Sequence, residues 1–177
     1  MSGHNKWSKI KHKKAATDSQ KSKIFGKYAR LITTEAKKNG GDTNSPGLRA
    51  VIEKAKSENM PNENIDRAVK KATEAGGAEM LEVVYEAYGP GGCAIVIDGL
   101  TENKNKAAAE VRHILSKNGF ELAASGSALW AFSKNEDREW VPSSTIPLSD
   151  ADGEKLSNII EELEDNDEVQ AVYTNAE

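Results

Sequence analysis

Apolar residues in the first half of the chain recur at helical spacing in three short stretches. In each stretch they stand at i, i+3 or i+4, and i+7, as a helix that buries one side requires. The first stretch ends at Gly40 and Gly41, and the second begins with Ser45 and Pro46, which are typical of a helix start. We therefore predict a three-helix domain over residues 17–77. Its apolar positions are Ile24, Tyr28, Leu31, Ile32, Leu48, Val51, Ile52, Ala55, Ile65, Ala68, Val69 and Ala72.

After this domain the apolar pattern changes to a period of two, which is typical of strands. It predicts a strand near Val83 and, after a glycine-rich turn at 89–92, a more buried strand at 94–97. From there the order strand, helix, strand occurs twice, so we predict an α+β fold class in which residues 78–177 form a ferredoxin-like (split βαβ) domain. The strand near Val83 is added at an edge. Further strands are expected at 128–132, 145–148 and 169–174. One helix is expected to start within 101–106, carry apolar residues at 107–115 and end at 118–119, and the other to follow Ser149 as its cap and carry apolar residues at 156–163. In the strand at 128–132, Ala128, Trp130 and Phe132 are expected to share a face.

Charge is divided unevenly along the chain. The first forty residues contain 11 Lys and Arg and only two acidic residues, although the whole chain contains 24 basic and 28 acidic residues. The remaining 137 residues therefore carry 13 basic and 26 acidic side chains. A cationic segment on an anionic protein favours a polyanionic ligand, and nucleic acid is the commonest polyanion in a cell. Residues 1–16, which have no sustained apolar period, are predicted to be a basic arm.

The candidate nucleic-acid contacts follow from the chemistry of these side chains. Lysines bind phosphates as point charges, Trp7 can stack on an unpaired base, and His4 or His12 can donate a hydrogen bond. The predicted contacts are His4, Lys6, Trp7, Lys9, Lys11, His12, Lys13 and Lys14 in the arm, and Lys21, Lys23, Lys27 and Arg30 on the first helix. A second contact is predicted at Lys104 and Lys106, beside a helix start whose N–H groups favour anions. In the alternative interpretation these are ordinary solvated side chains, and Thr101 or Asn103 caps that helix.

The inventory of reactive side chains argues against catalysis. The three histidines, His4, His12 and His113, and the single cysteine, Cys93, are scattered without a local pairing of nucleophile and base. His4 and His12 in the arm offer only two potential zinc ligands, so no metal site is expected. No cofactor or small-molecule substrate is expected either. No run of about eighteen apolar residues occurs, so we expect no membrane segment. The single cysteine fits a reducing compartment, and we expect a cytoplasmic protein.

Several ordered segments, distributed over nearly the whole chain, carry a family resemblance. They are Gly3-His4-Asn5-Lys6-Trp7, residues 10–16, Asn59-Met60-Pro61, residues 65–68, 88–92, 101–105 and 109–113, Gly126-Ser127 before Trp130, and Val169-Gln170 with Val172-Tyr173. These segments resemble the YebC family, which includes the translational activator of mitochondrial cytochrome c oxidase. Members of that family are longer and carry a further α/β lobe between the strands near Phe132 and Thr145. Here residues 133–144 alone join the two strands, so the family insertion is absent.

The resemblance implies regulation of gene expression without catalysis, in one of two ways. Bacterial members are described as probable DNA-binding transcriptional regulators, and other members act on the ribosome and ease elongation stalls at proline-rich stretches. The arm of this chain is rich in lysine and poor in arginine, which suits backbone contacts to folded RNA better than the readout of base edges. We therefore favour ribosomal RNA as the partner, with ribosomal proteins as further candidates. Duplex DNA is the alternative, and a purely protein-binding adaptor is a third hypothesis.

Overall fold

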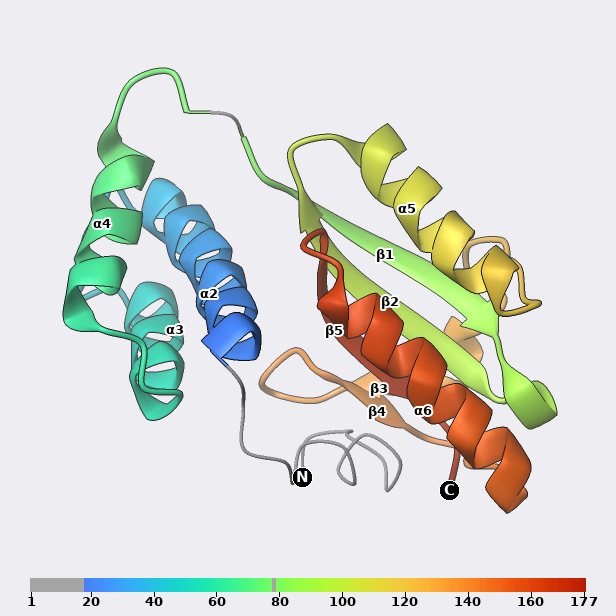
Figure 1. Cartoon of the computed structure of the whole chain (residues 1–177). Helices are drawn as coiled ribbons and strands as arrows, with labels where there is room; N and C mark the ends of the chain where they lie inside the picture. Colours follow the sequence, from blue (N-terminus) through green and yellow to red (C-terminus); the bar gives the residue numbers. More distant parts are fainter. Residues whose placement is uncertain (1–17, 78) are drawn as a thin grey trace. The chain divides into compact units, whose positions relative to one another are not determined.

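The computed structural model describes residues 18–77 and 79–177, which form two compact units (Figure 1). The helical unit ends at Leu81, and the α/β unit extends from Glu82 to Glu177. The order of elements confirms the predicted α+β class, with helices first and an α/β domain after them. The helices of the helical unit are α2 (Asp18–Lys38), α3 (Pro46–Ser57) and α4 (Asn62–Thr73). The elements that follow are β1 (Leu81–Tyr88), η1 (Pro90–Gly92), β2 (Ala94–Thr101), α5 (Lys104–Lys117), η2 (Leu129–Ala131), β3 (Phe132–Lys134), β4 (Trp140–Pro142), α6 (Asp150–Asp165) and β5 (Val169–Thr174).

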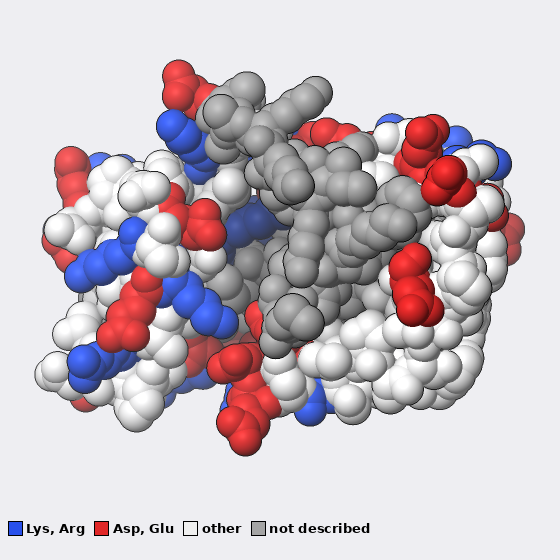
Figure 2. Space-filling view, turned by 90° about the horizontal axis from the view of Figure 1, so that it is seen from below, with Lys and Arg blue, Asp and Glu red and all other residues white. Residues whose placement is uncertain are grey.

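In the helical unit, α2 packs against both α3 and α4 through one apolar side. All the apolar positions predicted on α3 and α4 lie in this core. On α2 the buried side is displaced slightly from the prediction. Phe25, Ala29, Ile24 and Leu31 are all partly buried, but of these only Phe25 and Ala29 pack against the core cluster. The fully or nearly fully buried residues are Ile32, Ala36, Leu48, Ala55, Met60, Ile65 and Ala68. The outer surface of this unit carries basic and acidic side chains interspersed (left side of Figure 2).

Replacing Ile32 by Ala is expected to destabilise the helical unit by about 2–4 kcal/mol, because the side chain is completely buried between three helices. Urea unfolding followed by circular dichroism measures the loss. Ser22→Ala is a control at an exposed residue of the same helix and should change stability by less than about 0.5 kcal/mol. Equal losses for the two variants would contradict the assigned core.

The main sheet of the α/β unit has the strand order β1-β2-β5. β2 and β5 are antiparallel, with Val96 opposite Tyr173 and Ile97 opposite Val172. β1 and β2 are joined through η1, where the Gly89 N–H donates to the Cys93 carbonyl oxygen at 2.8 Å. Gly91 adopts a φ of +68°, a conformation that glycine allows at little cost. The glycine-rich segment is therefore the predicted tight turn.

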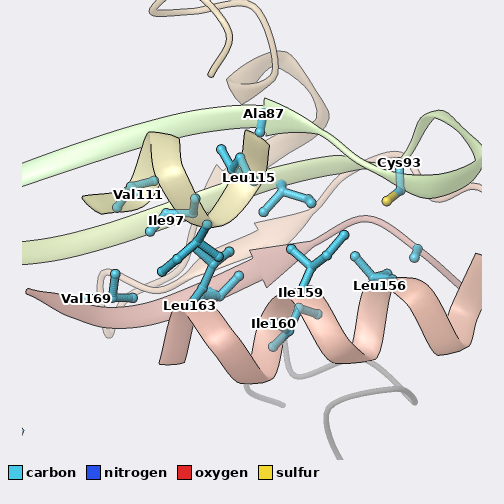
Figure 3. Close-up of a cluster of buried hydrophobic side chains, with 14 residues drawn as sticks. Ala87, Cys93, Ile97, Val111, Leu115, Leu156, Ile159, Ile160, Leu163 and Val169 are labelled. Carbon is cyan, nitrogen blue, oxygen red and sulfur yellow. The ribbon is translucent and has the colours of Figure 1, made fainter. Parts of the chain in front are cut away.

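Hydrophobic cores lie on both faces of this sheet, because successive strand residues point to opposite faces. On one face, α5 and α6 cover Ile95, Ile97 and Val172. Figure 3 shows Val111 and Leu115 of α5 and several apolar residues of α6 pointing toward the sheet. On the other face, η2 and the hairpin formed by β3 and β4 cover a second cluster. This cluster contains Ala94, Val96, Ala128, Ala131, Phe132 and Tyr173.

The hairpin of β3 and β4 is attached to the main sheet by its own side chains. Its strands are antiparallel, with Lys134 opposite Trp140. The Trp140 indole N–H donates to Asp98 Oδ1 of β2 at 3.0 Å, and Lys134 Nζ lies 4.5 Å from the centroid of the same ring. Burial raises the pKa of the Asp98 carboxyl above its ordinary value, although the hydrogen bond from Trp140 opposes that rise. The hairpin therefore has a defined position on the sheet.

The strand arrangement differs in two places from a complete split βαβ sheet. Residues 129–131 form a turn of 3₁₀ helix, and β3 then pairs with β4 in a separate sheet rather than entering the main one. In the segment 145–148, where a strand was predicted, only Ile146 forms a bridge, to Ala176. Pro147 lacks an N–H group and cannot contribute to a continuous ladder at this segment. The edge strand expected near Val83 is present as β1.

Candidate nucleic-acid interface

The two units differ strongly in charge. Residues 18–81 contain 12 Lys and Arg and 9 Asp and Glu, whereas residues 82–177 contain 7 basic and 19 acidic side chains. A polyanion is therefore attracted to the helical unit and repelled by the α/β unit. We therefore place the candidate interface on the helical unit. The predicted arm contacts, namely His4, Lys6, Trp7, Lys9, Lys11, His12, Lys13 and Lys14, lie outside the described residues.

Three of the four contacts predicted on α2 share one side of the helix. Lys23, Lys27 and Arg30 are spaced by four and three residues, the spacing at which helical side chains are neighbours. They stand on the side of α2 away from the buried residues Ile32 and Ala36. Lys23 is exposed, and Lys27 and Arg30 are partly buried. We call these three residues the basic stripe.

The fourth predicted residue on this helix, Lys21, is exposed near the beginning of α2. It precedes Lys23 by two residues, and side chains at that spacing do not face the same way. The structure therefore does not bring Lys21 together with the basic stripe. The sequence prediction placed all four residues on or near the polar side of this helix, and the helix phase separates Lys21 from the other three.

Two lysine pairs that sequence reasoning missed gather at one end of the helical unit. Lys37 and Lys38 lie in the last turn of α2, and Lys70 and Lys71 in the last turn of α4. The two helix ends are adjacent, since a Cβ on Gly41 would lie 2.8 Å from Thr73 Cγ2. Cations at a helix C-terminus interact favourably with the helix dipole and so stabilise the helix. This effect explains the position of these lysines even if they bind no ligand. The signal that could have found them is a lysine pair placed shortly before a glycine pair in both cases.

The remaining outer cations of the helical unit include two that pair along their own helices. Arg49 Nε lies 3.2 Å from Glu53 Oε1, and an Arg67 guanidinium nitrogen lies 3.1 Å from Glu63 Oε1. Both pairs are exposed and have i, i+4 spacing, so each stabilises its helix by a few tenths of a kcal/mol at most. They are better explained as helix surface pairs than as phosphate contacts.

The second predicted contact, at the start of α5, already has protein partners. Lys106 Nζ lies 3.1 Å from Glu168 Oε1 and 3.8 Å from Glu110 Oε1. The Asn103 side chain caps the helix by accepting from the N–H groups of Asn105 and Lys106. A phosphate at this helix start would have to displace both the cap and a carboxylate. The contact at Lys104 and Lys106 stays a prediction. Glu110, Glu168 and the Asn103 cap compete with a phosphate for this site, and the sequence did not reveal this competition.

Two sequence models of a known family match the chain. The one described as the TACO1/YebC protein N-terminal domain matches residues 5–75, and the one described as the TACO1/YebC second and third domain matches residues 80–136 and 134–176. The chain belongs to the TACO1/YebC family. The resemblance found in the sequence is thereby confirmed.

Relatives in the TACO1/YebC family are similar along the whole chain. The chain is 40% identical to a probable transcriptional regulatory protein of Thermoanaerobacter pseudethanolicus. The alignment of the two covers 100% of this chain and 97% of that protein. It is also 40% identical to a probable transcriptional regulatory protein of Fervidobacterium nodosum, with 99% and 93% covered. The fold is similar to the crystal structure of a conserved hypothetical protein from Aquifex aeolicus. That comparison has a TM-score of 0.85 and 30% sequence identity, and it covers 98% of this chain and 97% of the other.

The alignments with TACO1/YebC relatives also bear on the prediction that a family insertion is absent between residues 133 and 144. The alignment with the T. pseudethanolicus protein extends over 239 residues, whereas this chain has 177, so at least 62 aligned positions have no counterpart here. The two segments that match the family's second and third domain meet at residues 134–136. Those residues include the end of β3 and the start of the turn that leads to β4.

The described residues of this TACO1/YebC protein include one cysteine and no cluster of side chains that could hold a metal ion. Cys93 is buried, and burial raises the pKa of its thiol, which disfavours the reactive thiolate. Over residues 18–77 and 79–177, no group of three or more His, Cys, Asp and Glu side chains is placed to hold a metal ion. Within the same residues, every helix is too short or too polar to cross a membrane.

Proposed function

We propose that this member of the TACO1/YebC family is a nucleic-acid-binding regulator of gene expression that acts without catalysis, cofactor or small-molecule substrate. The observation that carries the proposal is the basic stripe on α2, presented by a unit with excess positive charge and joined to a unit with 19 acidic and 7 basic residues. Net charge attracts phosphates to the first unit and repels them from the second, which orients the protein on a polyanion. The basic arm at residues 1–16 supplies the remaining contacts in this proposal.

Ribosomal RNA is the partner that we favour, in a translation factor that eases elongation stalls at proline-rich stretches. Lysine binds phosphate as a point charge, whereas arginine is the residue best suited to bidentate contacts with guanine. Arg30 is the only arginine of α2, and the arm contains none. This composition supports contacts to a phosphate backbone and to folded RNA more than the readout of duplex sequence. Ribosomal proteins are candidate further partners, and the cytoplasm is the expected location.

Duplex DNA is the second candidate, because relatives that cover the whole chain are named probable transcriptional regulatory proteins. A DNA-binding regulator commonly places a helix in the major groove and dimerises to read two half-sites. This candidate predicts a sequence preference that survives competitor DNA, together with a dimer in solution.

Cosedimentation with purified ribosomes across a salt series distinguishes the two candidates. The full chain is compared with and without an excess of duplex DNA as competitor. Retention on ribosomes that resists the competitor supports the translation role. Loss of the protein to duplex DNA at modest salt supports a transcriptional regulator, and the absence of binding to both polymers contradicts the proposed function.

Neutralising the basic stripe is expected to weaken RNA binding and its dependence on salt. In a variant with Lys23→Gln, Lys27→Gln and Arg30→Gln, the slope of log K against log salt should become shallower by about 2–3, because each lost phosphate contact removes about 0.7–0.9. Fluorescence anisotropy with a labelled ribosomal RNA fragment measures the slope. Lys21→Gln removes one charge from another side of α2 and should change the slope by less than one third as much. A triple variant that behaves like Lys21→Gln would remove α2 from the interface.

We also propose a domain organisation to accompany this function. Residues 1–16 are the basic arm, residues 17–77 the three-helix domain, and residues 78–177 the α/β domain. The segment that longer relatives insert is absent between residues 133 and 144. The meeting point of the two matched segments at 134–136 supports this position.

A further inference from the structure

Gly26 stands near the middle of α2, a position at which glycine is unfavourable. The helix runs without interruption from Asp18 to Lys38, and Gly26 is not among the glycines with a positive φ. Any residue could therefore adopt its backbone conformation. Glycine in a helix interior also destabilises the helix relative to alanine. The local conformation thus gives no reason for a glycine at this position.

Packing within the described chain does not explain Gly26 either. The residue is exposed and, apart from its own helix backbone, no described atom lies within 4 Å of the place where a Cβ would stand. The glycines of the other described α-helices differ in this respect. A Cβ on Gly47 of α3 would lie 2.8 Å from Glu35 Oε2, and Gly153 of α6 is buried. The missing side chain of Gly26 therefore leaves open space.

This open space is a recess in the surface of α2. Backbone Cα atoms lie about 2.3 Å from the axis of a helix, whereas side chains extend its radius to about 5–6 Å. Bare backbone at Gly26 therefore lies about 3 Å below the level that side chains reach around it. Close approach of a ligand to the backbone is one of the common reasons for a glycine. We call this feature the Gly26 recess.

The Gly26 recess borders the basic stripe, and this position selects an anionic ligand. Lys23 precedes Gly26 by three residues and Arg30 follows it by four, so both are its neighbours on the helix surface. The acidic residues of α2 are Asp18 and Glu35, which are eight and nine residues away from Gly26. No acidic side chain of α2 is therefore a neighbour of the recess.

The chemistry of the recess favours a polymer backbone over a small anion. Peptide N–H groups in the middle of a helix are bonded within the helix, so the recess offers no free donor to a phosphate. A free phosphate ion would interact only with the flanking cations. The backbone of a nucleic acid gains more, because its sugar can pack on the bare helix while its phosphates remain beside the stripe.

We propose that the sugar–phosphate backbone of the bound nucleic acid passes over Gly26, with Lys23 and Arg30 on either side of it. This inference rests on the proposed function and adds the point of closest approach. A side chain at position 26 would hold the strand away from the helix and lengthen both charge contacts, which weakens them. Stability and binding therefore make opposite demands on this position.

Two substitutions of Gly26 in the full chain test the proposal by urea unfolding and by anisotropy with the labelled ribosomal RNA fragment. Gly26→Ala is expected to raise the urea midpoint, because alanine favours the helix, and to weaken RNA binding about threefold. Gly26→Gln adds a longer neutral side chain and is expected to weaken binding about tenfold. Ala50→Gln is the matched control. It adds neutral bulk at an exposed position of α3 and should leave binding within about twofold.

The outcomes distinguish this inference from the proposed function. Gly26→Gln that binds RNA as tightly as the unchanged protein, while the variant without the basic stripe binds weakly, would overturn the approach at Gly26 alone. A lower urea midpoint for Gly26→Ala would also overturn it, since another part of the chain would then fill the recess. Absence of binding by the unchanged protein to the RNA fragment and to a DNA duplex of equal length would contradict both proposals.

The same titrations identify the polymer that approaches the recess. Weaker binding of Gly26→Gln to both the RNA fragment and the DNA duplex supports a contact with the sugar–phosphate backbone that the two polymers share. Weaker binding to one of them alone supports the proposal for that polymer and assigns the recess to it.

Discussion

A protein lacking residues 1–16 is expected to bind ribosomal RNA with a much shallower dependence on salt than the full chain. The deleted arm contains the five lysines Lys6, Lys9, Lys11, Lys13 and Lys14 and no acidic residue. If each neutralises one phosphate, the slope of log K against log salt decreases in magnitude by about 3.5–4.5. This loss exceeds that expected from the three residues of the basic stripe. Anisotropy titrations between 50 and 200 mM salt, as a labelled RNA fragment is added, measure it.

A second variant separates charge from the other contributions of the arm. It keeps residues 1–16, including Trp7, and replaces the five lysines by glutamine. We expect it to lose the same part of the salt dependence as the deletion, while retaining whatever affinity Trp7 provides by stacking. An unchanged slope in both variants would show that the arm does not contact phosphates, and the proposed interface would then reduce to the helical unit.

Replacing Glu86 by Ala is expected to destabilise the α/β unit by about 3–5 kcal/mol. The carboxylate accepts three backbone hydrogen bonds in a buried position, and its removal leaves the N–H groups of Gly126, Ala128 and Leu129 without that acceptor. Hydrogen bonds to a buried charged group are among the most costly to remove. Glu86→Gln retains an oxygen but loses the charge, so a smaller loss of about 1–3 kcal/mol is expected.

Urea unfolding followed by circular dichroism measures both effects. Glu82→Gln is the matched control, because Glu82 is an exposed carboxylate on the same face of the same strand, and it should change stability by less than about 0.5 kcal/mol. If Glu86→Ala unfolds like the control, the loop at 126–129 does not depend on this carboxylate. The orientation of the Tyr88 and Trp130 rings, which hydrogen bonds join to this loop, would then require another explanation.

The helices of the first unit could be predicted because their signals are local. Apolar spacing, Pro46 at a helix start and the glycine pair at 40–41 all lie within or beside the element that they define. The misplaced strand at 128–132 had a different cause. The alternation of Ala128, Trp130 and Phe132 is typical of a strand, but the chain there follows hydrogen bonds to Glu86, about forty residues earlier. No local pattern reports an acceptor at that distance.

The candidate interface was predictable in composition but not in arrangement. The excess of lysine in the first forty residues indicated a polyanionic ligand, and this excess can be found by counting residues. The separation of Lys21 from Lys23 required the phase of α2. The pairing of Lys106 with Glu168 joins residues 62 positions apart and depends on tertiary structure. Trp130 was expected to share a strand face with Ala128 and Phe132, because the exposure of an aromatic ring cannot be read from its hydrophobicity.

The hairpin of β3 and β4 can accommodate a large difference in length between members of one family. Lys134 and Trp140 are paired across it, so their Cα atoms are separated by about 5 Å, and contacts with Asp98 attach Trp140 to the main sheet. A segment inserted at this turn would leave and rejoin the framework at neighbouring positions, so it could fold as an independent module without straining either strand. Evolution can therefore add or remove such a module in one event, and the packing of β2 and β5 beneath it would be preserved.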